Sequence, residues 1–276
     1  MSRLAPTACA LCLICLPPAA GAFAFFGQPG AGGSGPQPLQ TDTNVAPVVW
    51  PDAKVVVAMT LNFTGAYKDS MLDAMQTSWN AVGTPLQFQE GVSAAQPCDN
   101  APGSNAADGI NAAGFRQTTC ADQAFGDALA VTQVTHVRRN GTWELSDTDI
   151  MVDQSRPWIA QRAGQLQPGT YDFHRVVIHE LGHALGLEHP NDAGETVTAI
   201  MNSQVSGIET LQTDDIQGIE FLYEGTDSRT SSASQRDSSG ADASLGVLAL
   251  LGWGARRAFY RRRRRGMMQA RRDGKT

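Results

Sequence analysis

The 276-residue chain carries a net charge of −6, but more than half of its basic residues lie near its two ends. Residues 25–244 contain 10 basic and 26 acidic residues, a net charge of −16. A body this acidic repels nucleic acid and anionic lipid, so we exclude nucleic acid as a partner. Its length is enough for one domain with a well-buried core.

The N-terminus has the three parts of a secretory signal peptide. Arg3 precedes a short apolar run, residues 8–16, and small-x-small motifs that suit signal peptidase follow at residues 20–24. The apolar run is too short to span a bilayer as a stable helix, although an uncleaved N-terminal anchor is the alternative. We predict export, with residues 1–24 removed. Residues 25–49 are rich in Gly and Pro, so we expect a flexible mature N-terminus.

Hydrophobic patterning in the body predicts a sheet with a few helices. The predicted strands begin with residues 54–63 and 86–88, and continue with 128–138 and 143–152, joined by a hairpin turn at Asn140-Gly141. The predicted helices are 67–82, 157–166, 175–187 and 213–223, of which the second has the weakest pattern. Residues 91–126 are mostly polar and lack periodicity, so we expect a long loop there.

Two of the five cysteines lie in the body of the chain. The other three fall within the predicted signal peptide and would be removed with it, whereas Cys98 and Cys120 bracket a stretch rich in Gly, Ala and Asn. Their spacing excludes a C-x2-C metal pair. We predict one disulfide between Cys98 and Cys120, formed in an oxidising compartment.

The segment HELGHALGLEH, residues 179–189, contains three of the five histidines. In a helix, His179 and His183 project from the same face and can bind one ion. Gly186 lets the chain leave the helix in a conformation that most residues avoid, so that His189 can return as a third ligand. Three neutral imidazoles leave the fourth tetrahedral position open for water, which is the geometry of a catalytic zinc site.

Glu180 follows the first histidine and points about a quarter turn away from it. From there it can act on an activated water without binding the metal, so we predict that Glu180 is the general base. Surface histidines on an ordinary helix would produce this pattern in only about one in 10^5 such chains. A purely structural zinc site is disfavoured, because the sequence offers no obvious fourth protein ligand.

The pattern H-E-x-x-H-x-x-G-x-x-H resembles the zinc signature of the metzincin metallopeptidases. The flanking sequence resembles the matrixin branch, bacterial members included, over residues 50–225. This resemblance implies an α+β catalytic domain, with a twisted mixed sheet of about five strands and three main helices. One of these helices carries the motif. It also implies that Met201 forms an apolar floor beneath the metal without binding it.

Further roles follow from the same resemblance. Asp215 would bond the methionine turn from beneath, and Asp214 would meet the ammonium group of a mature N-terminus. Residues 146–152 would be the edge strand along which an extended peptide substrate binds. The Asn202-Ser203 pair replaces the tyrosine of the astacin branch, which favours the matrixin interpretation.

Several features depart from the matrixin pattern. Met151 stands where many members have a histidine that binds a second zinc, and His136 and His174 are isolated. There is no cysteine between residues 24 and 97, so no upstream thiolate can cap the metal. Carboxylates suited to calcium follow one another on the predicted strand, although a solvated acidic hairpin would explain them equally well. These carboxylates are Asp147, Asp149 and Asp153.

The C-terminus has a Ser-rich linker at residues 226–244, then a short apolar segment and an arginine cluster within residues 245–276. It resembles the C-terminal sorting signals of exported bacterial proteins, and most closely the type cut by rhomboid-family proteases. Gly240-Ala241 stands in place of the usual paired glycines. A permanent tail anchor is the alternative. A nucleic-acid-binding tail is disfavoured, because the apolar segment beside it would then have no purpose.

These observations predict an exported zinc endopeptidase, secreted or displayed on the surface of a Gram-negative bacterium. We expect a monomer that acts on protein or peptide substrates, is cut near its C-terminus by a processing protease, and meets a membrane only through that segment. Two alternatives remain. One is a catalytically silent surface protein that binds zinc and peptide, and the other is a hydrolase of non-peptide amides.

Overall fold

The computed structural model describes residues 22–30, 33–52, 54–60, 62–92, 95–98, 108–160 and 168–224. Nearly all of the predicted signal peptide lies outside these residues, as do the Ser-rich linker and the C-terminal apolar and arginine segments. Within the described part of the chain, none of the helices has the length and apolar character needed to cross a bilayer.

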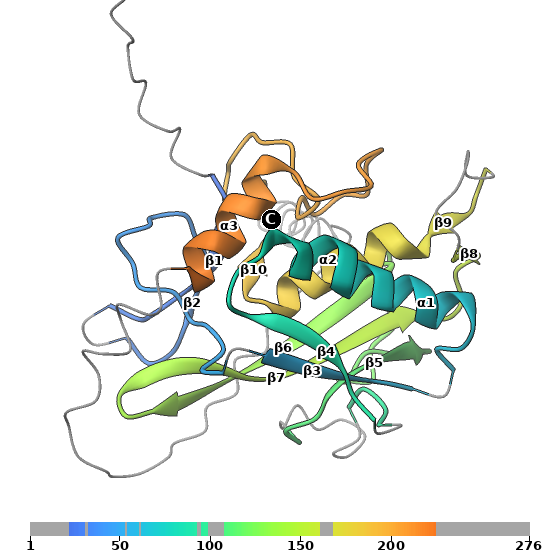
Figure 1. The fold of residues 1–276 in the computed structure, drawn as a ribbon, viewed down its shortest axis with the longest axis horizontal. Helices are drawn as coiled ribbons and strands as arrows, with labels where there is room; N and C mark the ends of the chain where they lie inside the picture. Colours follow the sequence, from blue (N-terminus) through green and yellow to red (C-terminus); the bar gives the residue numbers. More distant parts are fainter. Residues whose placement is uncertain are drawn as a thin grey trace, which may run out of the picture.

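A five-stranded mixed sheet forms one layer of the domain, with the strand order β4-β3-β5-β7-β6 (Figure 1). All neighbours run parallel except β6, which is antiparallel to β7. The strands are β3 (Lys54–Met59), β4 (Gln87–Glu90), β5 (Asn111–Arg116), β6 (Ala130–Arg139) and β7 (Thr142–Asp153). The predicted hairpin is confirmed, with Asn140 and Gly141 both at positive φ in its turn.

Helices α1 (Ala66–Asp73) and α2 (Phe173–Ala184) lie over one face of the sheet, and α3 (Thr213–Tyr223) is on the same side (Figure 1). Helix α1 continues through a π-helical stretch (Ala74–Trp79) and a 3-10 turn (Asn80–Val82). The chain then turns at Gly83, which has a φ of 87°. The α+β prediction of a mixed five-stranded sheet with three main helices is confirmed.

The main core lies between this face of the sheet and the helices. It combines aliphatic side chains of the sheet with aromatic rings from the helices and loops. Phe173, at the start of α2, meets the rings of Phe63, Tyr67 and Trp158 with centroid distances of 5.0 to 5.9 Å. Since such aromatic contacts add to the burial of apolar area, they fix α2 firmly against the sheet.

The prediction of a long loop at residues 91–126 was wrong in its middle. Residues Asn111–Arg116 form β5, which lies at the centre of the sheet. Its sequence, NAAGFR, lacks the β-branched residues that usually identify a strand. Glycine is required at position 114, because a Cβ there would collide with the side chain of Thr60, which directly follows β3.

The edge strand was also assigned to the wrong half of the hairpin. Residues 146–152 belong to β7, which is paired on both sides, by β5 and by β6. The free edge of the sheet on this side is β6, whose outer side borders the cleft described below. The alternating polar and apolar residues of both strands fit an edge position, so sequence alone could not distinguish them.

The N-terminal segment differs from the flexible chain that we expected. It contains β1 (Ala24–Gly27) and β2 (Gln37–Gln40), which form a small sheet with β10 (Leu187–Glu188). Phe25 is fully buried, and its ring lies 5.0 Å from that of Phe221 on α3. The Gly- and Pro-rich composition concealed this short apolar strand.

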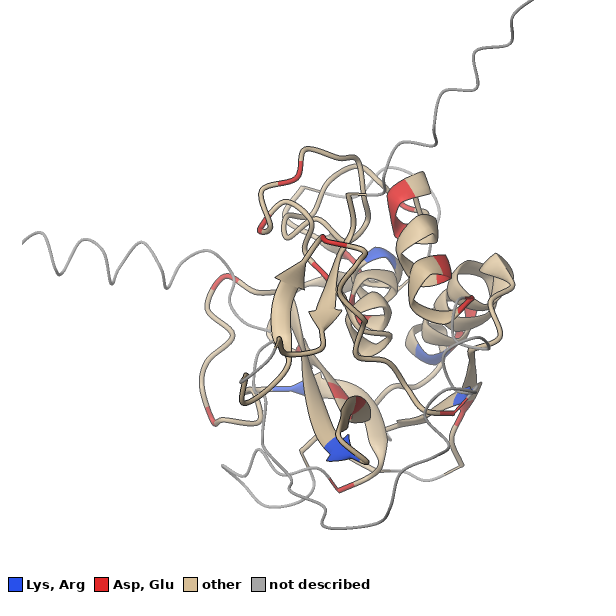
Figure 2. Ribbon diagram, turned by 90° about the vertical axis from the view of Figure 1, so that its left-hand side faces the viewer, with Lys and Arg blue, Asp and Glu red and all other residues tan. Residues whose placement is uncertain are grey.

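The weak helix predicted at residues 157–166 is not present in its described part. Residues Trp158–Ile159 form strand β8, which pairs with β9 (Tyr171–Asp172), whereas residues 161–166 lie outside the described residues. Along the described part of the chain, acidic residues are spread over loops, helices and strands, and basic ones are sparse (Figure 2).

We predict that Phe25→Ala destabilises the domain by about 3–5 kcal/mol, because it leaves a cavity between β1 and α3. Val92→Ala is the control, since Val92 is fully exposed and its loss should change stability by no more than about 0.5 kcal/mol. Urea unfolding of both variants measures the difference. Equal stabilities would show that β1 is not part of the cooperative fold.

Candidate metal centre and catalytic cleft

Helix α2 presents the first two histidines of the motif to one point. Asp172 caps the helix by accepting a hydrogen bond from the backbone N–H of Arg175. His179 and His183 lie one turn apart on the same face. The helix ends at Ala184, three residues before the end expected from periodicity at residue 187. The chain turns away from the helix axis at Gly186, which has a φ of 98°. This exit returns His189 to the other two imidazoles.

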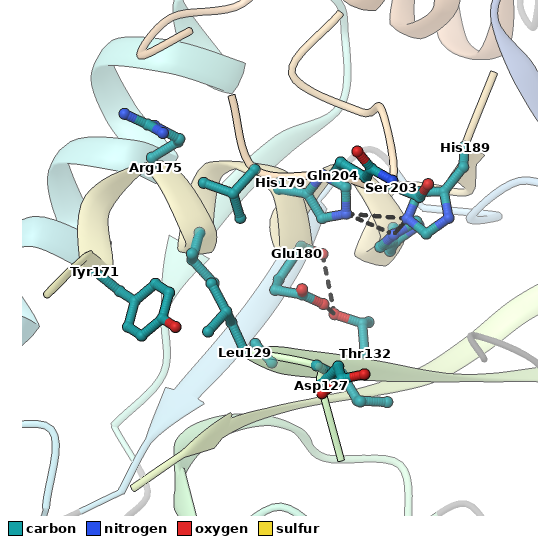
Figure 3. A pocket seen from close by; sticks show the side chains of 16 residues that line it. Asp127, Leu129, Thr132, Tyr171, Arg175, His179, Glu180, His189, Ser203 and Gln204 are labelled. Atoms are coloured by element: carbon teal, nitrogen blue, oxygen red, sulfur yellow. Dashed lines mark hydrogen bonds between the residues drawn. The ribbon is translucent and has the colours of Figure 1, made fainter. Parts of the chain in front are cut away.

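The three imidazoles meet through their Nε2 atoms. These atoms are separated by 3.1 Å for His179 and His183, 3.1 Å for His179 and His189, and 3.0 Å for His183 and His189. Figure 3 shows His179 and His189 facing each other at one end of the cleft, with His189 on the loop after α2. All three predicted metal-binding residues therefore converge.

The other ring nitrogen of each histidine faces an oxygen. Nδ1 of His179 is 2.8 Å from the carbonyl oxygen of Ile200, and Nδ1 of His183 is 2.8 Å from that of Leu187. Nδ1 of His189 is 3.0 Å from a carboxylate oxygen of Asp192. These oxygens can only accept, so each Nδ1 carries the proton and each Nε2 offers its lone pair.

This donor set fits a zinc ion. Three Nε2 lone pairs face one another with no proton between them, an arrangement that a cation stabilises and that water satisfies poorly. Tetrahedral zinc with bonds of about 2.0–2.1 Å places its ligand nitrogens about 3.3–3.4 Å apart. The observed separations differ from this by only a few tenths of an ångström. The three residues could therefore hold such an ion.

Burial favours the neutral form of two of the three imidazoles, those of His183 and His189. It lowers the pKa of His183 well below its ordinary value, and the neighbouring imidazoles lower it further. Burial also lowers the pKa of His189, while the carboxylate of Asp192 acts in the opposite direction. Neutral imidazole is the form that binds metal, so the local environment favours ligation at neutral pH.

Glu180 lines the same cleft and is 5% exposed. Its Oε2 accepts a hydrogen bond of 2.7 Å from the hydroxyl of Thr132 on β6 (Figure 3). Burial raises the pKa of this carboxyl, whereas the nearby imidazole of His179 and the hydrogen bonds from Thr132 lower it. The Glu180 carboxylate therefore lines the same cleft as the three histidines and forms no hydrogen bond with their Nε2 atoms.

The turn that contains Met201 supports the centre from beneath. Both carboxylate oxygens of Asp215 accept backbone hydrogen bonds there, from Ile200 at 2.9 Å and from Met201 at 3.1 Å. Asp215 is 1% exposed, and the carbonyl of Ile200 in turn holds His179. The buried carboxylate is thus connected to His179 through a single residue.

Glycines allow close approach on two sides of α2. At Gly182, a Cβ would overlap the sulfur of Met201 and come within 2.9 Å of the Trp79 ring. At Gly186, a Cβ would come within 3.3 Å of the carbonyl oxygen of Val48, in addition to the strain of its positive φ. Both positions therefore exclude larger residues.

The cleft has a volume of about 340 Å³ and runs along α2 from the histidines to Arg175 and Tyr171 (Figure 3). One wall is the start of β6 and the loop before it, residues 127–132, and the other is residues 203–205. Much of the lining is apolar, from alanine, leucine and valine side chains. The cleft therefore offers space for an apolar group beside the three imidazoles.

Asp214 lies beside Asp215 at the start of α3. Its Oδ1 accepts a 3.0 Å hydrogen bond from the backbone nitrogen of Ala22.

The two remaining histidines lie apart from the centre. His136 is buried against Phe26, and burial lowers its pKa to about 4. His174 forms a hydrogen bond with Asp73.

Cys98 and Cys120 are joined by a disulfide, with their Cα atoms 5.3 Å apart. The Met151 sulfur lies 3.6 Å and 3.3 Å from the two cysteine sulfurs, on the face of the sheet opposite the main core. The position at which the family resemblance placed a zinc ligand is thus part of a cluster of sulfur atoms.

The three aspartates of β7 are buried, which contradicts the solvated acidic hairpin. Asp153 accepts hydrogen bonds from Ser155 and Arg156. Burial raises the pKa of Asp147 to about 8 and that of Asp149 to about 7. Each of these two retains a buried Oδ1 without a hydrogen bond.

Comparison with known proteins agrees with this geometry. Residues 63–224, more than half of the chain, match the family model of the matrixins. The chain belongs to the matrixin family. Matrix metalloproteinase-16 of Homo sapiens and of Rattus norvegicus is 42% identical over 79 residues, which is 27% of this chain and 12% of that protein. Interstitial collagenase of Oryctolagus cuniculus is 45% identical over 53 residues, 19% of this chain and 11% of that protein. The chain therefore spans only about an eighth of these relatives.

Sequence reasoning missed two residues of this matrixin site. Asp192 orients His189 from three residues further along the chain, and Thr132 contacts Glu180 from a strand far away in sequence. Asp192 stands close to the motif, so its spacing could have suggested a role. Nothing in the sequence around Thr132 indicates its contact, which exists only because β6 lies beside α2.

We predict that Gly182→Ala weakens both the fold and the metal centre of this matrixin. The added Cβ overlaps Met201, so stability should fall by about 1–3 kcal/mol and zinc should dissociate faster. Gly207→Ala is the matched control, because a Cβ there meets open space. Urea unfolding and zinc transfer to a chromophoric chelator measure the two effects. Identical behaviour of both variants would contradict the close packing beneath the metal.

Proposed function

We propose that the chain is an exported zinc-dependent endopeptidase that hydrolyses peptide bonds in proteins or peptides. The observation that supports this most strongly is the convergence of three Nε2 lone pairs beside a buried carboxylate in an apolar cleft. Membership of the matrixin family favours a peptidase over the non-peptide amide hydrolase.

In this proposal His179, His183 and His189 hold the zinc, and their Nδ1 partners keep each ring in the required tautomer. When bound, zinc polarises the substrate carbonyl and activates water for attack. Met201 provides an apolar surface below the site, and Asp215 fixes the backbone of its turn. None of these supporting residues donates or accepts a proton in the reaction.

Glu180 is the general base of the proposed mechanism. Its carboxylate accepts a proton from the attacking water and then delivers it to the leaving amine. The substrate backbone would lie along the outer edge of β6, pairing with its free backbone groups. One substrate side chain would enter the apolar cleft between β6 and residues 203–205.

Four further parts of the proposal concern the rest of the chain. The signal peptide would direct export, and a protease would process the C-terminal sorting segment. The signal peptide would then end before residue 22, and not at the residue 24 expected from the sequence, because Phe23 and Ala24 are buried in the domain. A mature N-terminus there would place its ammonium group on Asp214, which the backbone nitrogen of Ala22 contacts. Asp147 and Asp149 would bind calcium, since both are buried and each has an oxygen without a hydrogen bond.

We predict that Glu180→Gln lowers kcat/KM on a peptide library by about 10²–10⁴-fold, because the amide cannot accept the water proton. Bound zinc should remain at one ion per chain, since Glu180 is not a ligand. Glu224→Gln, an exposed change at the end of α3, should match wild type. Equal turnover by wild type and Glu180→Gln would instead favour a zinc- and peptide-binding protein without catalysis.

A further inference from the structure

The carboxylate of Glu180 needs an external constraint to act as a general base. A glutamate side chain has three rotatable bonds, and a misplacement of about 1 Å can reduce the rate about 100-fold. The backbone of α2 fixes only where this side chain begins. Within the described residues, the one side chain that hydrogen-bonds the Glu180 carboxylate is Thr132.

Thr132 is well suited to provide that constraint. It is 0% exposed and lies on the face of β6 that is turned toward α2, together with Ala130 and Val134. Its hydroxyl is 2.7 Å from Oε2 of Glu180 and 3.2 Å from the carbonyl oxygen of the same residue. Threonine has a restricted χ1 because it is β-branched, so the donor has a defined direction.

The hydrogen bond distinguishes the two oxygens of Glu180. Oε2 accepts the hydrogen bond from the Thr132 hydroxyl, whereas no described side chain hydrogen-bonds Oε1, and Glu180 lines the cleft. A base that must reach water in the cleft therefore presents Oε1. Because Thr132 holds Oε2, the position of Oε1 is fixed as well.

We propose that Thr132 is a positioning residue for Glu180. Its hydroxyl holds the carboxylate in the one orientation that directs Oε1 into the cleft. This inference rests on the proposed function, in which Glu180 is the general base. It assigns a catalytic contribution to the edge strand β6 besides the binding of the substrate backbone, because one residue of that strand contacts the base.

The test compares three variants of the zinc-loaded protein. Thr132→Val keeps the shape and the strand preference of the side chain but removes the hydroxyl, and Thr132→Ser restores it. Thr135→Val is the matched control, since it makes the same change at a buried position of the same strand and Thr135 makes no side-chain contact with Glu180. Steady-state kinetics on a peptide substrate give kcat and KM for each variant.

We expect Thr132→Val to lower kcat about 10–100-fold with KM within about threefold of wild type, because the buried hydroxyl does not reach the substrate. Thr132→Ser should recover most of the lost kcat, and zinc content should be the same in all variants. A kcat for Thr132→Val within about twofold of wild type would overturn the inference. So would an equal loss in the Ser and Val variants, or a loss that follows zinc content.

Crystal structures of the zinc-loaded wild type and Thr132→Val provide a readout that does not depend on activity. The inference predicts that the Glu180 carboxylate is rotated or spread over several rotamers in Thr132→Val. An unchanged, well-ordered carboxylate would overturn it. If wild type is no more active than Glu180→Gln, the proposed function fails, and the crystal structures still decide whether Thr132 holds the carboxylate.

Discussion

The structure depends on three imidazoles whose Nδ1 atoms are all committed to oxygen acceptors. Each of these hydrogen bonds fixes a tautomer, and together they leave three lone pairs directed at one another within 3.1 Å. Neutral acceptors at this separation have no proton to share, so the arrangement is stabilised by a cation and by little else. Much of the surrounding fold can be understood as the means of holding these three rings in place.

Each ring is held by a different part of the fold. His179 is fixed through Ile200 by the buried carboxylate of Asp215 on α3. His183 bonds the carbonyl of Leu187 in β10, which pairs with the N-terminal strand β1. His189 is oriented by Asp192 on its own loop. A change in α3 or in β1 would therefore reach the three imidazoles through one or two hydrogen bonds.

The sequence predicted the parts of this structure that are local. The histidine motif, the end of α2 before Gly186 and helix α3 all depend on residues three to eleven positions apart in the sequence. Helix α3 begins and ends at the predicted residues. Strand β5 was missed because its sequence lacks β-branched residues, and β1 was missed because β10 and α3, which stabilise it, lie far away in the sequence. Thr132 and the edge role of β6 depend on which strands become neighbours, information that no single segment contains.

The central claim is that one divalent ion sits between the three Nε2 atoms with a position left for water. Crystals of purified protein loaded with zinc, measured on both sides of the zinc absorption edge, test this most directly. The account predicts a single strong anomalous peak about 2.0–2.1 Å from all three Nε2 atoms, with a solvent molecule as its fourth neighbour. No peak there, or a fourth ligand supplied by the protein, would contradict a catalytic metal centre.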